Sequence, residues 1–310
     1  MGDEWECVVI GGGAAGLSAA LVLGRARRRT LVVDADRQSN RAAPVIGGLL
    51  GFDRRPPAEF YAAGRRELSS YPSVEYRTGE VLGGTQVDGG LDLDLDDGQR
   101  VRARRVLLAT GMQYCPPEVP GLQALWGTSV FQCPFCHGWE MRDGRLAALA
   151  SGAVGVHAAL MLRGWSDDVV LLTDGPAHLD SAERQLLQTA GVPVDERRIA
   201  ELVGRDGRLH QVAFADGSPM RCDGLLVEAP LRQRSSLPEK LGASCASGVA
   251  PESIKVDALF RTDNPAVFAA GDACTEQPHV AGAVAAGSNA AMIVVQSLLA
   301  EEFGLPYPPT

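Results

Sequence analysis

Two cysteines separated by two residues, Cys133 and Cys136, are the residues of this sequence best suited to chemistry. We expect the pair to open a helix, where the helix dipole lowers the pKa of a thiol and favours reversible disulfide exchange. His137 follows the second cysteine, and a neutral imidazole can accept a proton from a thiol near pH 7. The stretch predicts thiol redox chemistry, although a CxxC pair also occurs in zinc sites and, followed by histidine, in c-type haem attachment.

The rest of the sequence argues against both metal-binding alternatives. A zinc site needs two further ligands at matched spacing, and the chain has no second CxxC pair and no HxxxH motif. A haem carrier needs a periplasmic address, whereas the first residues, MGDE, are not a basic region ahead of an apolar stretch. We therefore expect no metal and a cytoplasmic protein, whose five other cysteines do not form a disulfide framework.

Composition and charge limit the partners. The chain has 310 residues, 45% hydrophobic and 22% charged, which is typical of a soluble globular protein and predicts two domains. A net charge of −9 argues against nucleic acid and anionic membranes and favours small molecules as ligands. Residues 279–300 carry no charge and are long enough to span a bilayer. Their many alanines and glycines, with several polar residues, predict a helix buried in a core instead.

A dinucleotide-binding pattern stands at the start of the chain. Residues 7–10 predict a buried strand that runs into the sequence GGGAAG and then into a helical pattern. In this context Gly11 permits a tight turn, and Gly13 lets the backbone approach a pyrophosphate at the helix N-terminus. Gly16 lets the helix pack on the strand. Strand, fingerprint and helix together predict a bound dinucleotide.

The following elements support this reading. A second predicted strand, residues 30–33, ends at Asp34, where an acid hydrogen-bonds a ribose hydroxyl. Residues 57–70 predict a helix, and residues 74–111 predict a strand meander. Within it, residues 91–96 alternate strictly between leucine and aspartate. We interpret them as a strand with a solvated face, because the glycine and glutamate of a calcium loop are missing from their places.

Four motifs together resemble the low-molecular-weight thioredoxin reductase family of flavoproteins. They are the GxGxxG turn, Ala-Thr-Gly at residues 109–111, the CxxC pair and Ala-Gly-Asp at residues 270–272, and they match over essentially the whole chain. The resemblance implies an α/β fold of two doubly wound, Rossmann-like domains. An FAD-binding domain, residues 1–113 and 247–310, is then split around a degenerate pyridine-nucleotide-type domain, residues 114–246, that carries the CxxC pair.

The resemblance also implies a cofactor, FAD, bound tightly and non-covalently. In the family the aspartate of the Gly-Asp motif, here Asp272, binds the ribityl chain, and the Ala-Thr-Gly turn lies against the flavin where the two domains meet. The usual assembly is a homodimer. The residues expected to bind FAD are Gly11, Gly13, Ala14, Ala15, Gly16, Asp34, Ala109, Thr110, Gly111, Gly271 and Asp272.

The middle of the chain departs from the family where a pyridine nucleotide would bind. After the predicted strand at residues 145–149 the turn is ASGAVG, with Ala150 in place of the first turn glycine. The next strand, residues 169–172, leads into Thr-Asp-Gly-Pro rather than into the His-Arg-Arg run that clamps the NADP phosphate. Asp174 would repel a 2′-phosphate, although it could accept from the ribose of NAD. We favour a domain that keeps its fold and has lost its nucleotide.

The CxxC pair departs from the reductases as well. Those enzymes have an aspartate after the second cysteine as proton donor, whereas this chain has His137. The sequence CPFCHGW closely resembles the branch of FAD-dependent dithiol oxidases that close the disulfide of natural products such as gliotoxin and holomycin, the holomycin type most closely. That resemblance implies a role in natural product biosynthesis and self-resistance.

We therefore expect oxidation of a small dithiol. A substrate thiolate attacks the disulfide at Cys133, the second substrate thiol closes the product ring, and Cys136 passes two electrons to FAD. Dioxygen then reoxidises the flavin to give hydrogen peroxide. His137 is the favoured base and His279 the second candidate, while the plainer reading of His137 is a helix-entry histidine that only hydrogen-bonds the backbone.

The sequence leaves the dithiol unnamed. We expect Phe131, Phe135 and Trp139 to shape part of its pocket. The alternative function is an NAD(P)H-dependent thioredoxin or disulfide reductase, which the missing turn glycine and phosphate-binding cations argue against.

Overall fold

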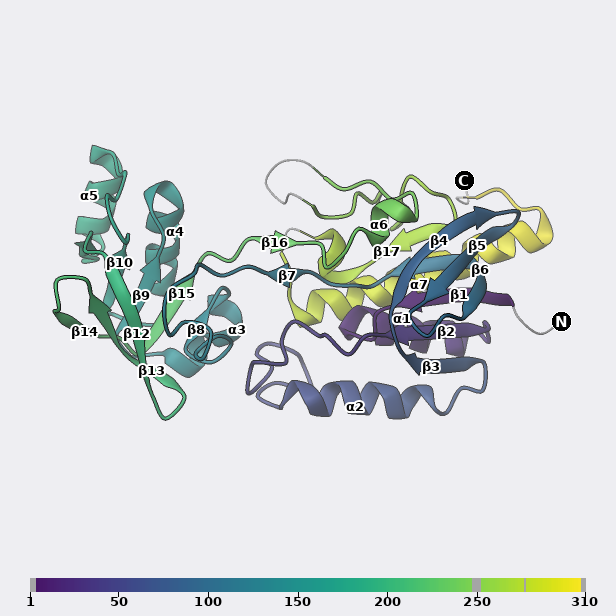
Figure 1. Cartoon of the computed structure of the whole chain (residues 1–310), viewed down its shortest axis with the longest axis horizontal. Coiled ribbons are helices and arrows are strands. Elements are labelled where there is room, and N and C mark those ends of the chain that lie inside the picture. The colour runs from purple at the N-terminus through teal and green to yellow at the C-terminus, as the bar shows by residue number, and fades with distance from the viewer. Residues whose placement is uncertain (1–3, 247–251, 276, 308–310) are drawn as a thin grey trace. The chain divides into compact units, whose positions relative to one another are not determined.

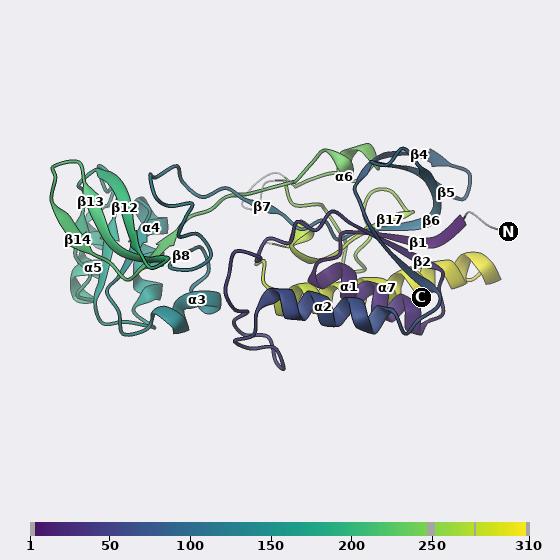
Figure 2. The ribbon, with the colours of Figure 1, turned by 60° about the horizontal axis from the view of Figure 1, so that its bottom comes forward.

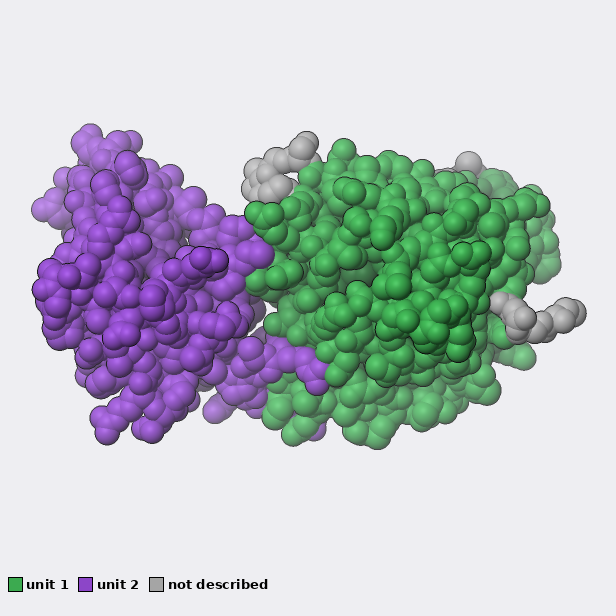
Figure 3. All heavy atoms as spheres, viewed as in Figure 1, with its two compact units in different colours: residues 1–39, 56–114, 231–310 green, residues 40–55, 115–230 purple. Residues whose placement is uncertain are grey.

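The computed structural model describes residues 4–246, 252–275 and 277–307. The chain divides into two compact units, which are coloured separately in Figure 3. Unit 1 comprises Met1–Ser39, Pro56–Tyr114 and Leu231–Thr310, and unit 2 comprises Asn40–Arg55 and Cys115–Pro230. The GxGxxG turn therefore belongs to unit 1, and the CxxC pair belongs to unit 2.

A mixed sheet forms the centre of unit 1 (Figure 1). Its strands are β1 (Glu4–Ile10), β2 (Thr30–Asp34), β3 (Val74–Thr78), β4 (Val81–Val87), β5 (Gly90–Leu95), β6 (Arg100–Leu108) and β17 (Val267–Ala269). They lie in the order β3-β2-β1-β6-β5-β4, and β17 pairs with β6. Alternate residues of β1 are buried in two different cores, Cys7 and Val9 in one and Val8 and Ile10 in the other. Both faces of the parallel part are therefore covered, as parallel sheets require.

Helices cover one face of this sheet. Figure 2 shows α1 (Ala14–Arg25), α2 (Pro57–Leu68) and α7 (Val280–Phe303) along that face. By length and composition α7 could cross a membrane. It packs closely on α1, however, because a Cβ added at Gly287 would lie 2.0 Å from the carbonyl oxygen of Ala15. The uncharged stretch predicted as a core helix thus forms the main helix contact of unit 1.

The stretch from residue 74 to residue 111 is only partly the predicted meander. β4, β5 and β6 pair antiparallel, but β3 pairs in parallel with β2 at the far edge of the sheet. The leucine and aspartate alternation of β5 is confirmed as a strand with a buried and a solvated face. Leu93 is fully buried, while Asp94 is partly exposed and forms an ion pair with Arg100 at 2.7 Å.

Unit 2 contains a second, smaller parallel sheet. Its strands, in spatial order, are β11 (Val194–Asp195), β10 (Val169–Leu172), β9 (Leu146–Leu149), β15 (Gly224–Val227) and β8 (Val130–Phe131). An antiparallel sheet follows, made of β12 (Ile199–Arg205), β13 (Arg208–Phe214) and β14 (Pro219–Arg221). The helices are α3 (Pro134–Met141), α4 (Gly152–Leu162) and α5 (Ser181–Thr189). Both units therefore carry the strand-turn-helix-strand arrangement of a doubly wound α/β fold.

The unit boundaries differ from the expected ones in two places. Residues 231–246 belong to unit 1, because Leu237 and Leu241 in and after α6 (Leu237–Lys240) are buried in its core. Residues 40–55 belong to unit 2 although they lie between segments of unit 1 in the sequence. Tertiary contacts decide both assignments, and no local pattern in the sequence predicts which unit these residues join.

Candidate active site

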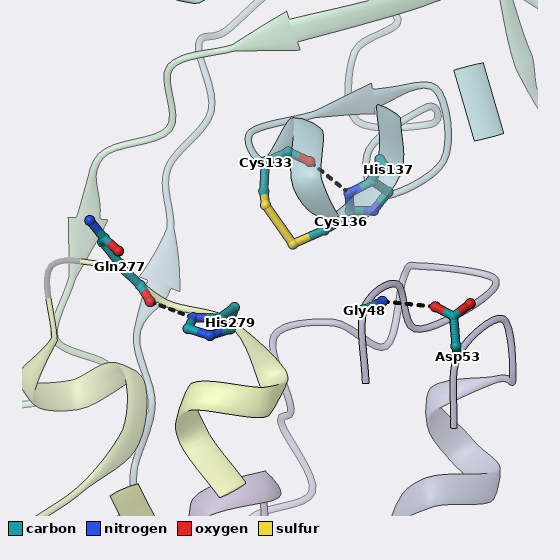
Figure 4. Close-up of a disulfide and its surroundings, with 7 residues drawn as sticks. All are labelled: Gly48, Asp53, Cys133, Cys136, His137, Gln277 and His279. Carbon is teal, nitrogen blue, oxygen red and sulfur yellow. Dashed lines mark hydrogen bonds between the residues drawn. A yellow bond between two sulfur atoms is a disulfide. The ribbon is translucent and has the colours of Figure 1, made fainter. Parts of the chain in front are cut away.

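The cysteine pair opens α3, as predicted. Cys133 is the N-cap residue, and its carbonyl oxygen accepts hydrogen bonds from the backbone N–H groups of Cys136 and His137, both at 3.2 Å. The two cysteines are joined by a disulfide, with their Cα atoms 5.3 Å apart (Figure 4). Because the unpaired N–H groups and the positive dipole end lie at this point, a thiolate formed here is stabilised.

His137 lies one residue beyond the pair and is held on two sides. Its Nδ1 is 3.4 Å from the carbonyl oxygen of Cys133, and its ring stacks on Phe131. Burial lowers the pKa of His137, and the backbone of Cys133 opposes this shift. A proton on Nδ1 can donate to that carbonyl, and in that tautomer Nε2 is the acceptor. Nε2 is buried and has no hydrogen-bond partner among the described residues.

The three aromatic residues expected around a pocket have different positions. Phe131 is fully buried in the core, so its predicted place in a pocket wall is wrong. Phe135 is 76% exposed and meets Trp165 edge to face, and Trp139 is 56% exposed with the Arg142 guanidinium 4.1 Å above its ring. Of these three residues, Phe135 and Trp139 on α3 are therefore available to contact a substrate.

Segment 40–55 of unit 2 packs against α3, a contact that the sequence analysis did not predict. A Cβ added at Gly47 would lie 2.4 Å from the carbonyl oxygen of Cys136. The segment is folded back on itself by a hydrogen bond from the Gly48 N–H to Asp53, at 2.8 Å (Figure 4). The Gly-Gly pair at 47–48 is the signal that could have indicated a close backbone approach.

His279, the second candidate base, belongs to unit 1. It is the N-cap residue of α7, and its exposed ring places Nδ1 2.8 Å from the carbonyl oxygen of Gln277 (Figure 4). The ring lies over the first turn of α7, where a Cβ added at Gly282 would come within 2.5 Å of Cε1. The structure thus brings Cys133, Cys136 and His137 together on α3 and places His279 in the other unit.

The β1–α1 turn of unit 1 has the geometry of a phosphate-binding turn. Gly11 has a φ of +107°, and a Cβ there would lie 2.3 Å from the carbonyl oxygen of Ala109. A Cβ at Gly16 would lie 1.8 Å from the carbonyl oxygen of Gly11, so the helix packs against the turn. Gly13 is the N-cap residue of α1, and a Cβ added there would lie 4.0 Å from the nearest neighbour, Cγ of Gln38. Backbone N–H groups at this helix end are therefore free to bind an anion.

Three buried polar atoms of unit 1 indicate the rest of a cofactor site. Thr110 Oγ1, Asp272 Oδ1 and Arg234 Nε are buried without a hydrogen-bond partner among the described residues. Burial raises the pKa of Asp272, and the charges of His279 and Arg234 oppose that shift. Buried polar atoms normally have a partner in the protein, in ordered water or in a ligand, and these three residues fit a polar cofactor such as FAD.

Arg234 is a buried residue of unit 1 that the sequence did not reveal, and it fits the same candidate cofactor site. Its Nη2 donates to Ser39 Oγ at 2.8 Å and to the carbonyl oxygen of Met112 at 3.0 Å. Burial lowers the pKa of Arg234. No motif surrounds it in the sequence, and only the fold brings it near Asp272.

Asp34 ends β2 beside the turn, as expected. It is only 4% exposed and accepts hydrogen bonds from Gln38 Nε2 at 3.0 Å, the Asp36 N–H at 3.1 Å and the hydroxyl of Tyr76. A Cβ added at Gly12 would lie 2.6 Å from its Cγ. The carboxylate is thus held at the turn, and its contact with a ribose stays a prediction.

The β9–α4 turn of unit 2 follows the same path but is filled by its own chain. The N–H of Ala150 donates to the carbonyl oxygen of Leu172 at 3.1 Å, and the N–H of Gly11 donates to that of Val33 at 2.8 Å. Leu172 therefore matches Val33. The next residue, Thr173 and not Asp174, matches Asp34. The Thr173 hydroxyl donates to the carbonyl oxygen of Gly175 at 2.6 Å. The N–H of Gly152 donates to the carbonyl oxygen of Ala177 at 2.9 Å.

Asp174 has a structural role here. Its carboxylate accepts a hydrogen bond from the N–H of Ile199 at 2.7 Å, at the start of β12. Asp174 thus lies one residue beyond the position that matches Asp34, which in unit 2 holds Thr173, and a contact of Asp174 with the ribose of NAD stays a prediction.

Comparison with known proteins identifies the family. A family model described as pyridine nucleotide-disulphide oxidoreductase matches residues 5–289. Thioredoxin reductase tcpT of Claviceps purpurea is 32% identical over 96% of this chain and 95% of its own. Thioredoxin reductase aclD of Aspergillus oryzae is 28% identical over 96% of this chain and 98% of its own.

Solved structures give the same result. An oxidoreductase from Agrobacterium tumefaciens superposes with a TM-score of 0.90 at 36% identity, covering 96% of this chain and 99% of that one. HlmI superposes with a TM-score of 0.90 at 35% identity, covering 97% of this chain and 94% of that one. With its FAD-binding fold and its disulfide, the chain belongs to the pyridine nucleotide-disulphide oxidoreductase family, as a thioredoxin-reductase-like flavoprotein.

Proposed function

We propose that this flavoprotein is a dithiol oxidase that closes an intramolecular disulfide in a small dithiol natural product, with dioxygen reduced to hydrogen peroxide. The observation that carries the proposal is the hydrogen bond from the Gly152 N–H to Ala177 O, which occupies a donor that a nucleotide pyrophosphate would use. A family member without a place for a nicotinamide must take its electrons from another donor. The disulfide on α3 accepts them from thiols.

The similarity to HlmI supports the same proposal. It agrees with the resemblance of the CPFCHGW stretch to dithiol oxidases of the holomycin type. His137 stands in this chain where the reductases have an aspartate, and burial keeps it neutral by lowering its pKa. A neutral base beside a disulfide suits an enzyme that removes protons from thiols.

The cysteine pair carries out two exchange steps. A substrate thiolate attacks Sγ of Cys133, the S–S bond breaks, and Cys136 leaves as a thiolate in the first turn of α3. The second substrate thiol then attacks the mixed disulfide, so the product disulfide forms and Cys133 is released as a thiolate. FAD, when bound, supplies the two-electron oxidant that restores the disulfide and passes the electrons to dioxygen.

His137 and His279 are the two groups proposed to take the thiol protons. Nε2 of His137 is the acceptor in the tautomer that the Cys133 carbonyl selects. His279 presents an exposed ring at the N-terminus of α7. In unit 1 Thr110, Arg234 and Asp272 would hold the flavin through their unpaired polar atoms.

The direction of reaction follows from redox poise. A disulfide closed in a small ring departs from its relaxed dihedral angle, which stores several kcal/mol and raises its reduction potential by about 30 mV per 1.4 kcal/mol. Dioxygen is oxidising enough to drive such a closure. A nicotinamide couple would drive the same exchange towards the dithiol.

An anaerobic titration of the flavin-loaded protein tests the proposal. We expect no rapid bleaching by NADPH or NADH, and bleaching by the reduced form of a cyclic-disulfide natural product. In air the dithiol should yield stoichiometric peroxide with wild type and none with Cys133→Ser or Cys136→Ser. Cys115→Ser is the matched control, since Cys115 is a partly buried free thiol of the same unit.

A reductase that uses NAD(P)H is the second candidate, because tcpT and aclD are named thioredoxin reductases. Bleaching by NADPH within seconds would establish it in place of the oxidase. Undiminished turnover in either cysteine variant would show that the flavin oxidises the dithiol without the cysteine pair.

The proposal extends to assembly and location. We propose a homodimer, the usual assembly in the family, and a cytoplasmic setting in natural product biosynthesis and self-resistance. Light scattering of the purified protein measures the first, since a monomer at micromolar concentration would contradict it. Neither nucleic acid nor a membrane is among the proposed partners, because the chain carries a net charge of −9.

A further inference from the structure

Phe131 supports the imidazole of His137 from the core of unit 2. It is the last residue of β8, pairs with Leu226 of β15 and is 0% exposed. The centroids of the Phe131 and His137 rings are 5.5 Å apart, and their planes differ by 11°. The ring of Phe131 is therefore a fixed surface, and a stack of this geometry restricts the tilt of the imidazole.

The second restraint comes from the helix itself. Nδ1 of His137 lies 3.4 Å from the carbonyl oxygen of Cys133, one turn earlier. A carbonyl sets which nitrogen carries the proton, and a stacked ring sets how far the imidazole can turn about its χ2 angle. With the proton on Nδ1, Nε2 is a buried acceptor with no partner among the described residues.

We propose that Phe131 is a positioning residue for thiol oxidation, holding His137 in the orientation and tautomer in which Nε2 is the proton acceptor. The inference rests on the proposed function for the use of that acceptor, while the state of the imidazole is independent of it. A buried acceptor without a partner strongly favours an incoming donor, such as a thiol, because it recovers a missing hydrogen bond.

The charged surroundings of His137 are simple enough to interpret a titration. On its own helix Glu140 raises the pKa of His137, as do the backbone groups of Cys133 and Gly127. Burial acts in the opposite direction and is the largest cause. Among the described contributors Glu140 is the one charged side chain, and β8 contributes Phe131 as an uncharged neighbour.

The experiment is a nitrogen-15 NMR titration of histidine in the flavin-loaded full chain. The sequence has five histidines, and His137→Gln identifies the signal of His137. We expect wild type to show a single tautomer with the proton on Nδ1 and a midpoint below the ordinary value of about 6.5. In Phe131→Leu the midpoint should move up towards that value and the tautomers should mix, because the flat support is gone.

Two further variants separate positioning from stability. Phe214→Leu removes an equally buried phenylalanine of unit 2 that belongs to another core cluster, so it should lower Tm but leave the His137 signal unchanged. Phe131→Tyr keeps the flat ring and should restore the wild-type signal. An unchanged midpoint and tautomer in Phe131→Leu, or a proton on Nε2 in wild type, would overturn the inference.

Kinetics connect the inference to turnover. In dithiol oxidation Phe131→Leu should lower kcat about tenfold, a fraction of the ~10² to 10⁴ that general base catalysis supplies. In the His137→Gln background the same change should have almost no further effect, because Phe131 acts through His137. Equal losses in both backgrounds would contradict a positioning role. Absence of dithiol oxidation in wild type would refute the proposed function and leave the NMR result standing.

Discussion

The β1–α1 turn of unit 1 and the β9–α4 turn of unit 2 have the same topology and different interiors. The first uses a positive φ of +107° at Gly11, whereas the second has Ala150 at that place and shifts the positive φ, of +59°, to Gly152. A Cβ at Gly16 would lie 1.8 Å from the carbonyl oxygen of Gly11, whereas a Cβ at Gly155 would lie 2.8 Å from the carbonyl oxygen of Ala150. The helix therefore packs less tightly on the turn in unit 2.

The polar groups of the two units also differ in whether they are hydrogen-bonded to their own chain. Unit 1 leaves Thr110, Arg234 and Asp272 with buried atoms that have no partner in the described chain. In unit 2 the hydroxyl of Thr173 and the carboxylate of Asp174 are hydrogen-bonded to their own chain. Buried polar atoms without a partner are places where a ligand can bind, because such atoms rarely remain unsatisfied. Pairing with the chain does not by itself exclude a ligand, since Asp34 of unit 1 is also hydrogen-bonded to Gln38 and Tyr76.

The largest effect is expected from adding a methyl group to each turn. Gly16→Ala places a Cβ against backbone that cannot move cheaply, so we expect a loss of about 3 kcal/mol or more in stability and failure to retain FAD. Gly155→Ala also meets backbone, the carbonyl oxygen of Ala150 at 2.8 Å, but requires a smaller shift, so it should cost about 1 kcal/mol and leave the flavin bound. Chemical unfolding and the flavin absorbance of the purified protein measure both, and equal losses would remove the distinction between the turns.

A smaller effect is expected from the two aspartates. Asp272→Ala should weaken FAD binding about 10- to 100-fold, because a hydrogen bond to a charged group contributes about 1.5 to 3 kcal/mol. Asp174→Ala should lower stability by about 1 to 2 kcal/mol through loss of the Ile199 contact, without changing the affinity for FAD. Fluorescence titration with FAD checks this, and a weakened affinity in Asp174→Ala would contradict it.

The pH dependence of stability should reveal His137. Burial lowers its pKa in the folded protein below the ordinary value of about 6.5. As the pH falls through that value, the unfolded chain takes up a proton that the folded chain does not, so stability falls on the acid side and is unaffected well above it. Urea unfolding at pH 7.5 and 5.5 should show a smaller loss for His137→Gln than for wild type. Identical losses of stability in the two proteins would show that the His137 ring is exposed to water.

The smallest effect is expected from restoring the missing glycine. Ala150→Gly recreates the GxGxxG pattern but leaves the Gly152 N–H bonded to Ala177 O, so we expect no gain of NADH or NADPH binding. Stability should fall by about 0.5 to 1 kcal/mol from the added chain entropy. Calorimetric titration measures binding, and a micromolar affinity for either nucleotide would show that the glycine alone separates the two turns.

Much of unit 1 follows from local sequence. A buried strand, three spaced glycines, a helical pattern and a strand ending in Asp34 specify one arrangement, because each step depends on short-range geometry. The helix beginning at the cysteine pair is equally local. The family resemblance then added the Ala-Thr-Gly turn and Asp272, and both have a buried atom without a partner in the described chain.

Other features depended on contacts between residues far apart in sequence. Phe131 appeared as a pocket residue, yet its strand pairing turns it into the core beneath His137. Arg234 carries no motif and segment 40–55 carries only the Gly-Gly pair at 47–48, and the fold places them beside Asp272 and Cys136. Residue type and spacing were enough to indicate which residues are suited to redox chemistry. Which polar groups stay free for a ligand was decided only by the tertiary structure, because a hydrogen bond such as Gly152 to Ala177 depends on how a distant loop returns.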